Sequence, residues 1–158
     1  MPGRLLAIGH RPQEVDAGCL AACVQMAMAH LGLCVSQADL NRLLELTPGG
    51  IPIWRLVRLE QHYDVLVTLR CGTLDDLIWA LERDLPPIVF VRTGQLPYWT
   101  VDTQHALLIS GYEGSAFLVN DPPFPTAPQH IAALDLSLAG DEFDNRYALL
   151  SRTKVARS

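Results

Sequence analysis

The chain has 158 residues, of which 49% are hydrophobic and 18% charged, enough for one domain with a substantial core. This composition excludes an intrinsically disordered chain, and the net charge of −5 argues against binding nucleic acid by neutralising phosphates. A membrane span is not expected, because even the most apolar stretch, Gly18 to Leu33, contains Gln25 and His30. We therefore expect a single domain over residues 1–158.

The first residues, MPGRLLAIGHRPQ, lack the apolar region and the cleavage site of a secretory signal. The four cysteines are Cys19, Cys23, Cys34 and Cys71. With no signal and an ample core, we expect reduced thiols in a cytoplasmic protein. Cys19 and Cys23 share one face of a predicted helix, which is a poor geometry for a disulfide.

The first half of the chain is predicted to be mainly helical. Asp16 is a candidate N-cap for a helix from about Ala17 through CLAACVQMAMAHLG, with Gly32 as its C-terminal stop. Because this helix is apolar almost all round, it should be buried and central. The other elements expected here are a helix opened by Ser36 and Asp39, a helix from about Pro52 to Tyr63, a strand from Val65 to Arg70, and a helix capped by Thr73 that stops before Pro86 and Pro87.

The second half is predicted to consist mainly of antiparallel strands. These are Ile88 to Arg92, His105 to Tyr112, Ala116 to Asp121, Gln129 to Ala132 and Arg146 to Ser151, with a loop at LPYWTVDTQ and a short helix from about Leu136 to Phe143. A turn at Glu113, Gly114 and Ser115 joins the second and third strands. Helices followed by antiparallel strands indicate the α+β class.

Cys19 is the first candidate for chemistry. It lies in the first turn of the apolar helix, where free N–H groups and the helix dipole favour an anion. A thiolate at such a position has a lowered pKa and is a better nucleophile near neutral pH. The alternative, an ordinary buried cysteine, is not excluded by this position alone.

A cysteine nucleophile needs a base, usually a histidine that a third group orients. His105 is the best placed of the five histidines, because it opens a strand just after a loop. A three-residue loop from Glu113 to Ser115 would set Asp121 opposite Leu107, diagonal to His105 on the same face. A two-residue loop would put His105 and Asp121 on opposite faces. Asp121 also fits a simpler role, as a turn residue before two prolines.

Acyl transfer by a thiolate also needs hydrogen-bond donors for the oxyanion. Gln13, six residues before Cys19, has a side-chain N–H that would complement the backbone N–H of Cys19. A glutamine upstream of a cysteine carries little information by itself.

Tyr98 and Trp99 precede His105 on the predicted loop, so they are candidates to line a substrate groove, although ordinary packing also explains them. A zinc site is disfavoured, because the Cys-x₃-Cys spacing of Cys19 and Cys23 lacks the tight turn of a structural site. No cofactor is expected.

The segment from Gln13 to Met26, QEVDAGCLAACVQM, resembles the start of bacterial cysteine peptidases of the C39 and C39-like type. The resemblance continues through PPIVFVRTGQLPYW, HALLISGY, LVNDP and DNRYALL, so it covers nearly the whole chain from Gln13 to Leu150. Its specificity comes from the order and spacing of these segments. It implies a papain-like α+β fold, in which a central helix bearing the cysteine packs on an antiparallel sheet.

The resemblance also implies a role for each candidate residue. Cys19 would be the nucleophile, His105 the general base, Asp121 the residue that orients the histidine, and Gln13 the oxyanion donor. One difference is that family members commonly read Asp-Cys-Gly, whereas this chain reads Asp-Ala-Gly-Cys-Leu, so Leu20 would narrow access beside the thiol.

The function expected from these residues is hydrolysis of an amide bond in a peptide or protein substrate. Two alternatives remain: acyl transfer by the same residues, and a papain-like module that binds a peptide without catalysis. The complete set of Gln13, Cys19, His105 and Asp121 favours catalysis, since a binding module has no need of all four.

Overall fold

The elements of the fold follow the predicted order closely. The structure is a computed structural model that describes residues 3–153. In chain order it contains β1 (Gly3–Leu5), α1 (Cys19–His30), α2 (Gln37–Leu43), the 3-10 helix η1 (Ile53–Arg58), α3 (Leu59–His62), β2 (Val65–Cys71), α4 (Leu74–Glu82), β3 (Ile88–Arg92), the 3-10 helix η2 (Thr93–Gln95), β4 (Gln104–Glu113), β5 (Ala116–Asn120), β6 (Gln129–Ala132), α5 (Ala133–Asp141) and β7 (Arg146–Arg152).

Several details differ from the prediction. The helix expected from Pro52 to Tyr63 is a 3-10 helix in its first part, η1, and an α-helix only in α3. Helix α5 begins at Ala133, earlier than the predicted Leu136. Strand β1 was not predicted, because three residues are too few to show an alternating pattern.

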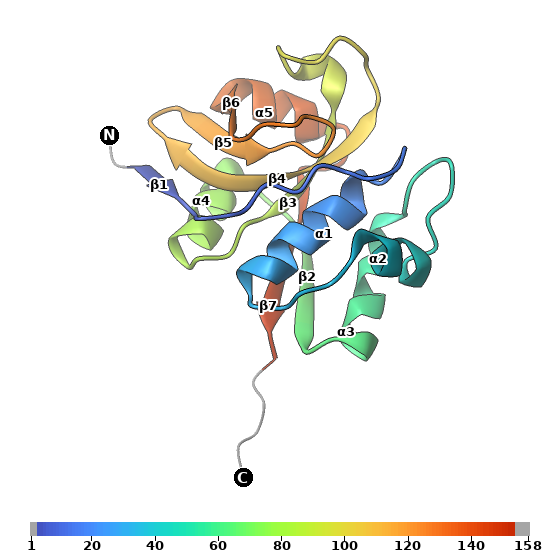
Figure 1. Cartoon of the computed structure of the whole chain (residues 1–158). Coiled ribbons are helices and arrows are strands. Elements are labelled where there is room, and N and C mark those ends of the chain that lie inside the picture. Colours follow the sequence, from blue (N-terminus) through green and yellow to red (C-terminus); the bar gives the residue numbers. More distant parts are fainter. Residues whose placement is uncertain (1–2, 154–158) are drawn as a thin grey trace.

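The strands form one antiparallel sheet in the order β2-β7-β3-β4-β5-β6, which confirms the α+β class. Strand β4 is the longest and has three partners. Along one edge, β3 pairs with its first half and β1 pairs with its last three residues, and β5 pairs along the other edge. Figure 1 shows β4 running through the middle of the molecule above α1.

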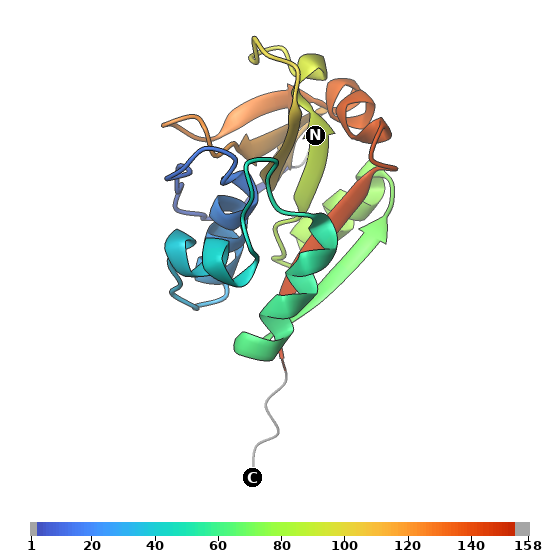
Figure 2. The same ribbon diagram turned by 90° about the vertical axis from the view of Figure 1, so that its right-hand side faces the viewer.

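The sheet is covered on both faces, and the alternation along its central strands shows how. In β3, Ile88 and Phe90 pack in the cluster that contains α1, whereas Val89 and Val91 pack in the cluster that contains α4 and α5. Figure 2 shows α1 and α2 on one side of the sheet and α5 on the other. A strand buried on both faces has to be apolar throughout, as the run IVFV is.

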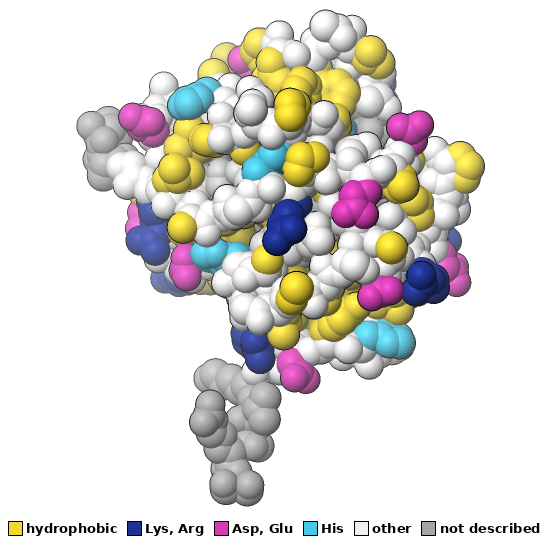
Figure 3. Space-filling model, viewed as in Figure 1, with side chains coloured by type: hydrophobic (Ala, Val, Ile, Leu, Met, Phe, Trp, Pro, Cys, Tyr) yellow, Lys and Arg dark blue, Asp and Glu magenta, His cyan; other side chains and the backbone are white. Residues whose placement is uncertain are grey.

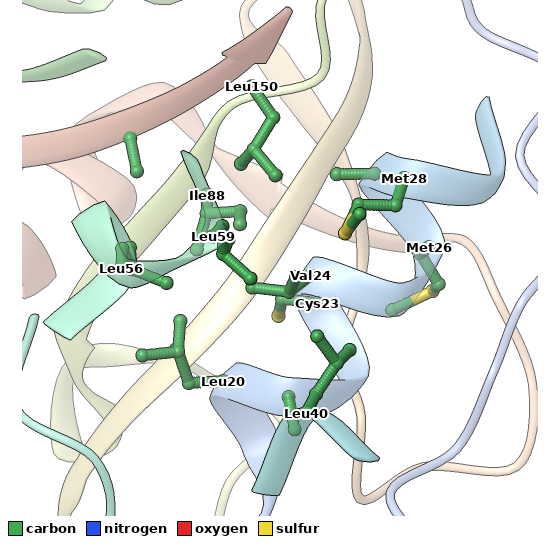
Figure 4. Packing of buried hydrophobic residues seen from close by; sticks show 14 of the residues in the cluster. Leu20, Cys23, Val24, Met26, Met28, Leu40, Leu56, Leu59, Ile88 and Leu150 are labelled. Carbon is green, nitrogen blue, oxygen red and sulfur yellow. The ribbon is translucent and has the colours of Figure 1, made fainter. Parts of the chain in front are cut away.

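Helix α1 is buried along most of its length, as its sequence predicted. Five of its residues have no exposed surface, namely Ala21, Ala22, Cys23, Val24 and Met28. Figure 4 shows Cys23 and Val24 among leucines from α2, η1 and α3, with Ile88 and Leu150 contributed by the sheet. The small residues let these elements approach closely, so the position of α1 relative to the sheet is tightly fixed.

Helix α1 begins later than expected, and the predicted cap is wrong. Its N-cap is Gly18, with no side-chain cap, and Ala17 has a left-handed backbone with φ of 59°. That conformation keeps Ala17 out of the helix and rules out Asp16 as its cap. A Cβ on Gly18 would lie 2.9 Å from the carbonyl oxygen of Val15, so a glycine is needed there. Cys19 is therefore the first residue of the helix.

The hairpin between β4 and β5 differs from the prediction in two ways, whose effects on the pairing of its strands cancel. Glu113 pairs directly with Ala116, so the loop has two residues, not three. Beyond the turn, a bulge at Ser110 shifts the register by one residue, and Leu108 then pairs with Asn120. This register, continued by one residue, sets Asp121 opposite Leu107. The predicted common face for His105 and Asp121 is correct, but the bulge produces it.

Charged side chains are dispersed over the face shown in Figure 3, where acidic and basic groups alternate and neither gathers in a patch. This pattern agrees with the modest net charge of −5. Within residues 3–153, no helix has the length and apolar character needed to span a membrane.

We expect Gly111→Ala to destabilise the protein by roughly 1–3 kcal/mol, the usual cost of overpacking. A Cβ at position 111 would lie 2.3 Å from the carbonyl oxygen of Arg4, which is backbone of β1 and cannot rotate away. Urea unfolding measures the change. Gly9→Ala is the control, because nothing lies within 4 Å of its added Cβ. Equal stability of the two variants would contradict the close approach of β1 to β4.

Candidate active site

A cleft of about 540 Å³ opens between the first turn of α1 and the start of β4. Gln13, Cys19 and His105 all line it, so three of the four residues singled out in the sequence meet at one surface. One wall is formed by residues 48–51 and Ile53, and the opposite wall includes Phe90, Arg92, Asp102, Thr103, Gln104 and Phe143. Asp121 lies behind His105, where it is fully buried.

Cys19 is partly exposed at the start of α1, where backbone N–H groups lack partners within the helix. Burial alone would raise the pKa of its thiol. The hydrogen bond and positive charge of His105, with N–H groups of Ala106 and Leu20, outweigh burial and hold the pKa below its ordinary value. The thiol is therefore readily ionised.

His105 is held between the thiol and a carboxylate. Its Nε2 lies 2.5 Å from Oδ1 of Asp121, which leaves Nδ1 for the hydrogen bond to Cys19. Burial alone would lower the pKa of the imidazole, but its bonds to Asp121 and Cys19 raise the pKa to about 9. The lowered pKa of the thiol and the raised pKa of the imidazole both favour a thiolate and imidazolium pair over the neutral pair.

Asp121 is fully buried, so its charge must be satisfied by neighbouring donors. Oδ1 takes the bond from His105. Oδ2 accepts from the Tyr98 hydroxyl at 2.6 Å and from Trp99 Nε1 at 2.8 Å. The Phe124 ring packs edge-on against both aromatic rings and shields the carboxylate.

The positions of Tyr98 and Trp99 refine the prediction that both line a substrate groove. Trp99 does line the cleft, and its ring lies 4.8 Å from that of His105. Tyr98 is not among the lining residues, because its hydroxyl points to Asp121. Nothing in the sequence indicated that Tyr98 and Trp99 would both donate hydrogen bonds to Asp121.

Cys23 provides an internal contrast to Cys19. It lies one turn further along α1 and is completely buried. Burial, together with the negative charges of Cys19 and Asp121, raises the pKa of its thiol well above the ordinary value. Of these two cysteines, only Cys19 therefore has an environment that favours a thiolate.

The amide of Gln13 points into the cleft from a rigid turn. Its Nε2 donates to the carbonyl oxygen of Val15 at 3.1 Å, and the N–H of Gly18 donates to the same oxygen at 3.1 Å. One acceptor thus links the Gln13 side chain to the residue that precedes Cys19. Nε2 makes no other hydrogen bond within residues 3–153, and Gln13 lines the same cleft as Cys19. Oε1 is buried without a partner among the described residues.

The loop that carries Tyr98 and Trp99 is held at its base by residues that the sequence did not single out. Thr93 is fully buried, and its hydroxyl donates to the carbonyl oxygen of Val101 and accepts from the N–H of Thr103. Beside it, Arg92 donates twice to Asp102, at 3.0 and 3.2 Å. Both contacts hold the two ends of the loop together, which fixes the positions of Tyr98 and Trp99 beside Asp121.

A metal-dependent site is not evident in the described part of the chain. Among residues 3–153, no three His, Cys, Asp or Glu side chains are grouped in a way that could hold a metal ion.

Comparison with solved structures shows the fold. A protein from Bacillus anthracis assigned as a C39-like peptidase has a TM-score of 0.79 and 14% identity, with all of both chains covered. A double-glycine-motif protease from an AMS/PCAT transporter, solved with its leader peptide, has a TM-score of 0.74 and 13% identity over 94% of each chain. The peptidase domain of Streptococcus ComA, a bifunctional ABC transporter of a quorum-sensing pathway, has a TM-score of 0.68 and 17% identity, covering 91% of this chain and 98% of that one.

Sequence comparison shows the family. No curated protein matches the chain. The sequence model of the Peptidase_C39 like family matches residues 5–155, which includes the cleft, the helix that begins at Cys19 and every strand from β2 to β7. The protein therefore belongs to the Peptidase_C39 like family.

Proposed function

We propose that this protein is a cysteine peptidase that hydrolyses an amide bond in a peptide substrate. The observation that carries the proposal is the hydrogen-bonded series of Cys19, His105 and Asp121, of which Cys19 and His105 line an open cleft. The thiol has a lowered pKa at a helix N-terminus, and the imidazole is bonded on its far side to the buried Asp121. A module that only binds peptides has no use for an ionised thiol held in this way.

Each residue has a distinct role in the proposed reaction. The Cys19 thiolate attacks the carbonyl carbon of the substrate, and the electron pair of the C=O bond moves to its oxygen. The backbone N–H of Cys19 and the free N–H of Gln13 stabilise this oxyanion. When the C–N bond breaks, the imidazolium of His105 gives its proton to the leaving amine.

The second half of the reaction restores the enzyme. Water attacks the thioester on Cys19, and neutral His105 accepts the proton that this water loses. Collapse of the second oxyanion releases the acid and the Cys19 thiolate beside the imidazolium. Asp121 holds the imidazole orientation throughout, because its bond to Nε2 keeps Nδ1 directed at the thiol.

A peptide substrate is supported by the cleft and by one structural relative. The cleft is open, and its lining includes the loop of residues 48–51, in which Gly49 has no side chain to cover its backbone. The related transporter protease was solved with its leader peptide in place.

Alkylation by iodoacetamide near neutral pH is expected to modify Cys19 before Cys23, since the pKa of the Cys19 thiol is lowered and that of the Cys23 thiol is raised. Peptide mapping of a time series measures the order of reaction. Cys19→Ala should abolish hydrolysis of a fluorogenic peptide library. Cys23→Ala is the matched control on the same helix, and should retain activity while losing about 1 kcal/mol of stability to a small cavity. Faster modification of Cys23, or activity that survives Cys19→Ala, would refute the proposal.

The pH dependence of Cys19 alkylation should depend on His105. In the natural chain the thiolate forms below the ordinary cysteine pKa of about 8.5, because His105 outweighs burial. In His105→Ala the effect of burial, which raises the pKa of the Cys19 thiol, is less strongly opposed. The midpoint of the alkylation curve should therefore move to higher pH. Peptide hydrolysis should also fall as the pH rises through about 9, where His105 loses its proton. His62→Ala, at an exposed histidine in α3, should change neither curve. An unchanged midpoint in His105→Ala would contradict the ion pair.

Tyr98→Phe should lower kcat about tenfold with little change in KM, because a hydrogen bond to a charged group contributes about 1.5–3 kcal/mol and this side chain does not line the cleft. Trp99→Phe should change both constants, since Trp99 bonds Asp121 and also lines the cleft. Steady-state kinetics on the best library peptide measure both effects. Tyr112→Phe is the control, because that hydroxyl bonds Glu82 instead. A kcat for Tyr98→Phe equal to that of the control would show that the bond to Asp121 is dispensable.

A further inference from the structure

The backbone on both sides of Gln13 is held by one buried side chain. Gln37, the first residue of α2, is only 1% exposed. Its Nε2 donates to the carbonyl oxygen of Pro12 at 2.9 Å, and its Oε1 accepts from the N–H of Glu14 at 3.0 Å. The amide of Gln37 thus pairs with the segment around Gln13 much as a neighbouring strand would.

The orientation of Gln37 is fixed in turn by the helix that carries Cys19. The Nε2 of Gln37 also donates to Oε1 of Gln25, which lies on α1, at 2.9 Å. Gln25 Nε2 donates to the carbonyl oxygen of Val35 at 3.0 Å, so the direction of each amide in the chain is determined by its acceptors. Both N–H groups of Gln37 are used, and neither amide can rotate without losing a bond.

The Gln13 side chain makes few contacts that would position it by itself. Its one side-chain hydrogen bond is to Val15, and its Oε1 is buried without a partner among residues 3–153. Its backbone is held on the other side, where the N–H of Gln13 donates to the carbonyl oxygen of Pro122 at 2.9 Å. The place of the Gln13 amide relative to Cys19 therefore depends on the bonds made by its backbone and its neighbours.

We propose that Gln37 is a positioning residue for the oxyanion site, which it aligns with Cys19 through Gln25 and the backbone of Pro12 and Glu14. This inference rests on the proposed function, in which Gln13 donates to the oxyanion. A donor displaced by a fraction of an ångström stabilises the developing charge poorly, so the segment has to be rigid.

Ordinary packing does not account for a glutamine at this position. The next inward-facing positions, Leu40 in α2 and Leu44 at its C-cap, are leucines with no exposed surface. A buried amide carries a desolvation cost that a methionine or leucine would avoid. Every side-chain hydrogen bond of Gln37 goes either to the Gln13 segment or to the helix of Cys19, which is where a rigid link between the two would be built.

The test compares two reactions at the same sulfur. Acylation by p-nitrophenyl acetate passes through an oxyanion, and release of p-nitrophenol reports its rate. Alkylation by iodoacetamide is a displacement at carbon that forms no oxyanion, so it reports only the thiolate. The variants are Gln37→Met, Gln25→Met and Gln13→Ala. Leu40→Val is the control, because it loosens the packing of α2 but leaves the amide bonds in place.

In Gln37→Met, acylation should fall about tenfold while alkylation stays within about twofold of the natural chain. Gln25→Met should show the same selective loss to a smaller extent, and Leu40→Val should show none. If Gln37→Met lowers both reactions equally, or lowers neither, the proposed role of Gln37 is wrong. If Gln37→Met does not fold, Gln25→Met decides the test instead. The proposed role of Gln37 is then wrong if Gln25→Met slows acylation and alkylation equally, or slows neither.

Failure of the proposed function itself gives a different result. Acylation that persists in Cys19→Ala, or is absent from the natural chain, would overturn the cysteine mechanism and this inference with it. If acylation depends on Cys19 but Gln13→Ala leaves its rate unchanged, the oxyanion donor is wrongly assigned. A selective loss in Gln13→Ala without one in Gln37→Met would reject only the positioning role.

Discussion

The site depends on burying one negative charge, that of Asp121. A carboxylate without exposed surface is unfavourable unless donors surround it, and three do so here, from His105, Tyr98 and Trp99. These donors come from β4 and from the loop before it, so the need to satisfy Asp121 also fixes that loop. The same carboxylate raises the pKa of His105, and His105 lowers the pKa of Cys19. The pKa of a partly exposed thiol is thus influenced, through His105, by a carboxylate that water does not reach.

Helices α1 and α2 support different parts of the cleft. Helix α1 supplies Cys19 from its first residue and, further along, the amide of Gln25. Helix α2 supplies Gln37, whose side-chain amide bonds the backbone on both sides of Gln13. Because α1 is packed without free surface over much of its length, the thiol and the proposed oxyanion site are held by the same rigid helix. The sheet carries the remaining groups, and the cleft lies where helix and sheet meet.

The sequence was most informative where a residue had a strong local preference. The all-round apolar helix, the Thr73 cap and the proline stops led to the right elements, since these signals act within one turn. The common face of His105 and Asp121 was predicted from an incorrect turn, because a bulge at Ser110 has no signature in one sequence. The start of α1 was misplaced since the left-handed Ala17 depends on tertiary contacts. Gln37 and Thr93 were missed altogether, as buried polar residues look like surface residues until their partners are known.

The two-residue turn and the bulge between β4 and β5 make the hairpin sensitive to odd and even changes in length. Side chains alternate between the faces of a strand, so inserting or deleting one residue between His105 and Asp121 moves one of them to the other face. In this hairpin the two-residue turn alone would place His105 and Asp121 on opposite faces, and the one-residue bulge returns them to the same face. A one-residue change of length is therefore compatible with the site only when a second one-residue change compensates for it, for example a longer turn together with loss of the bulge. Loop grafting into this protein has to follow the same rule.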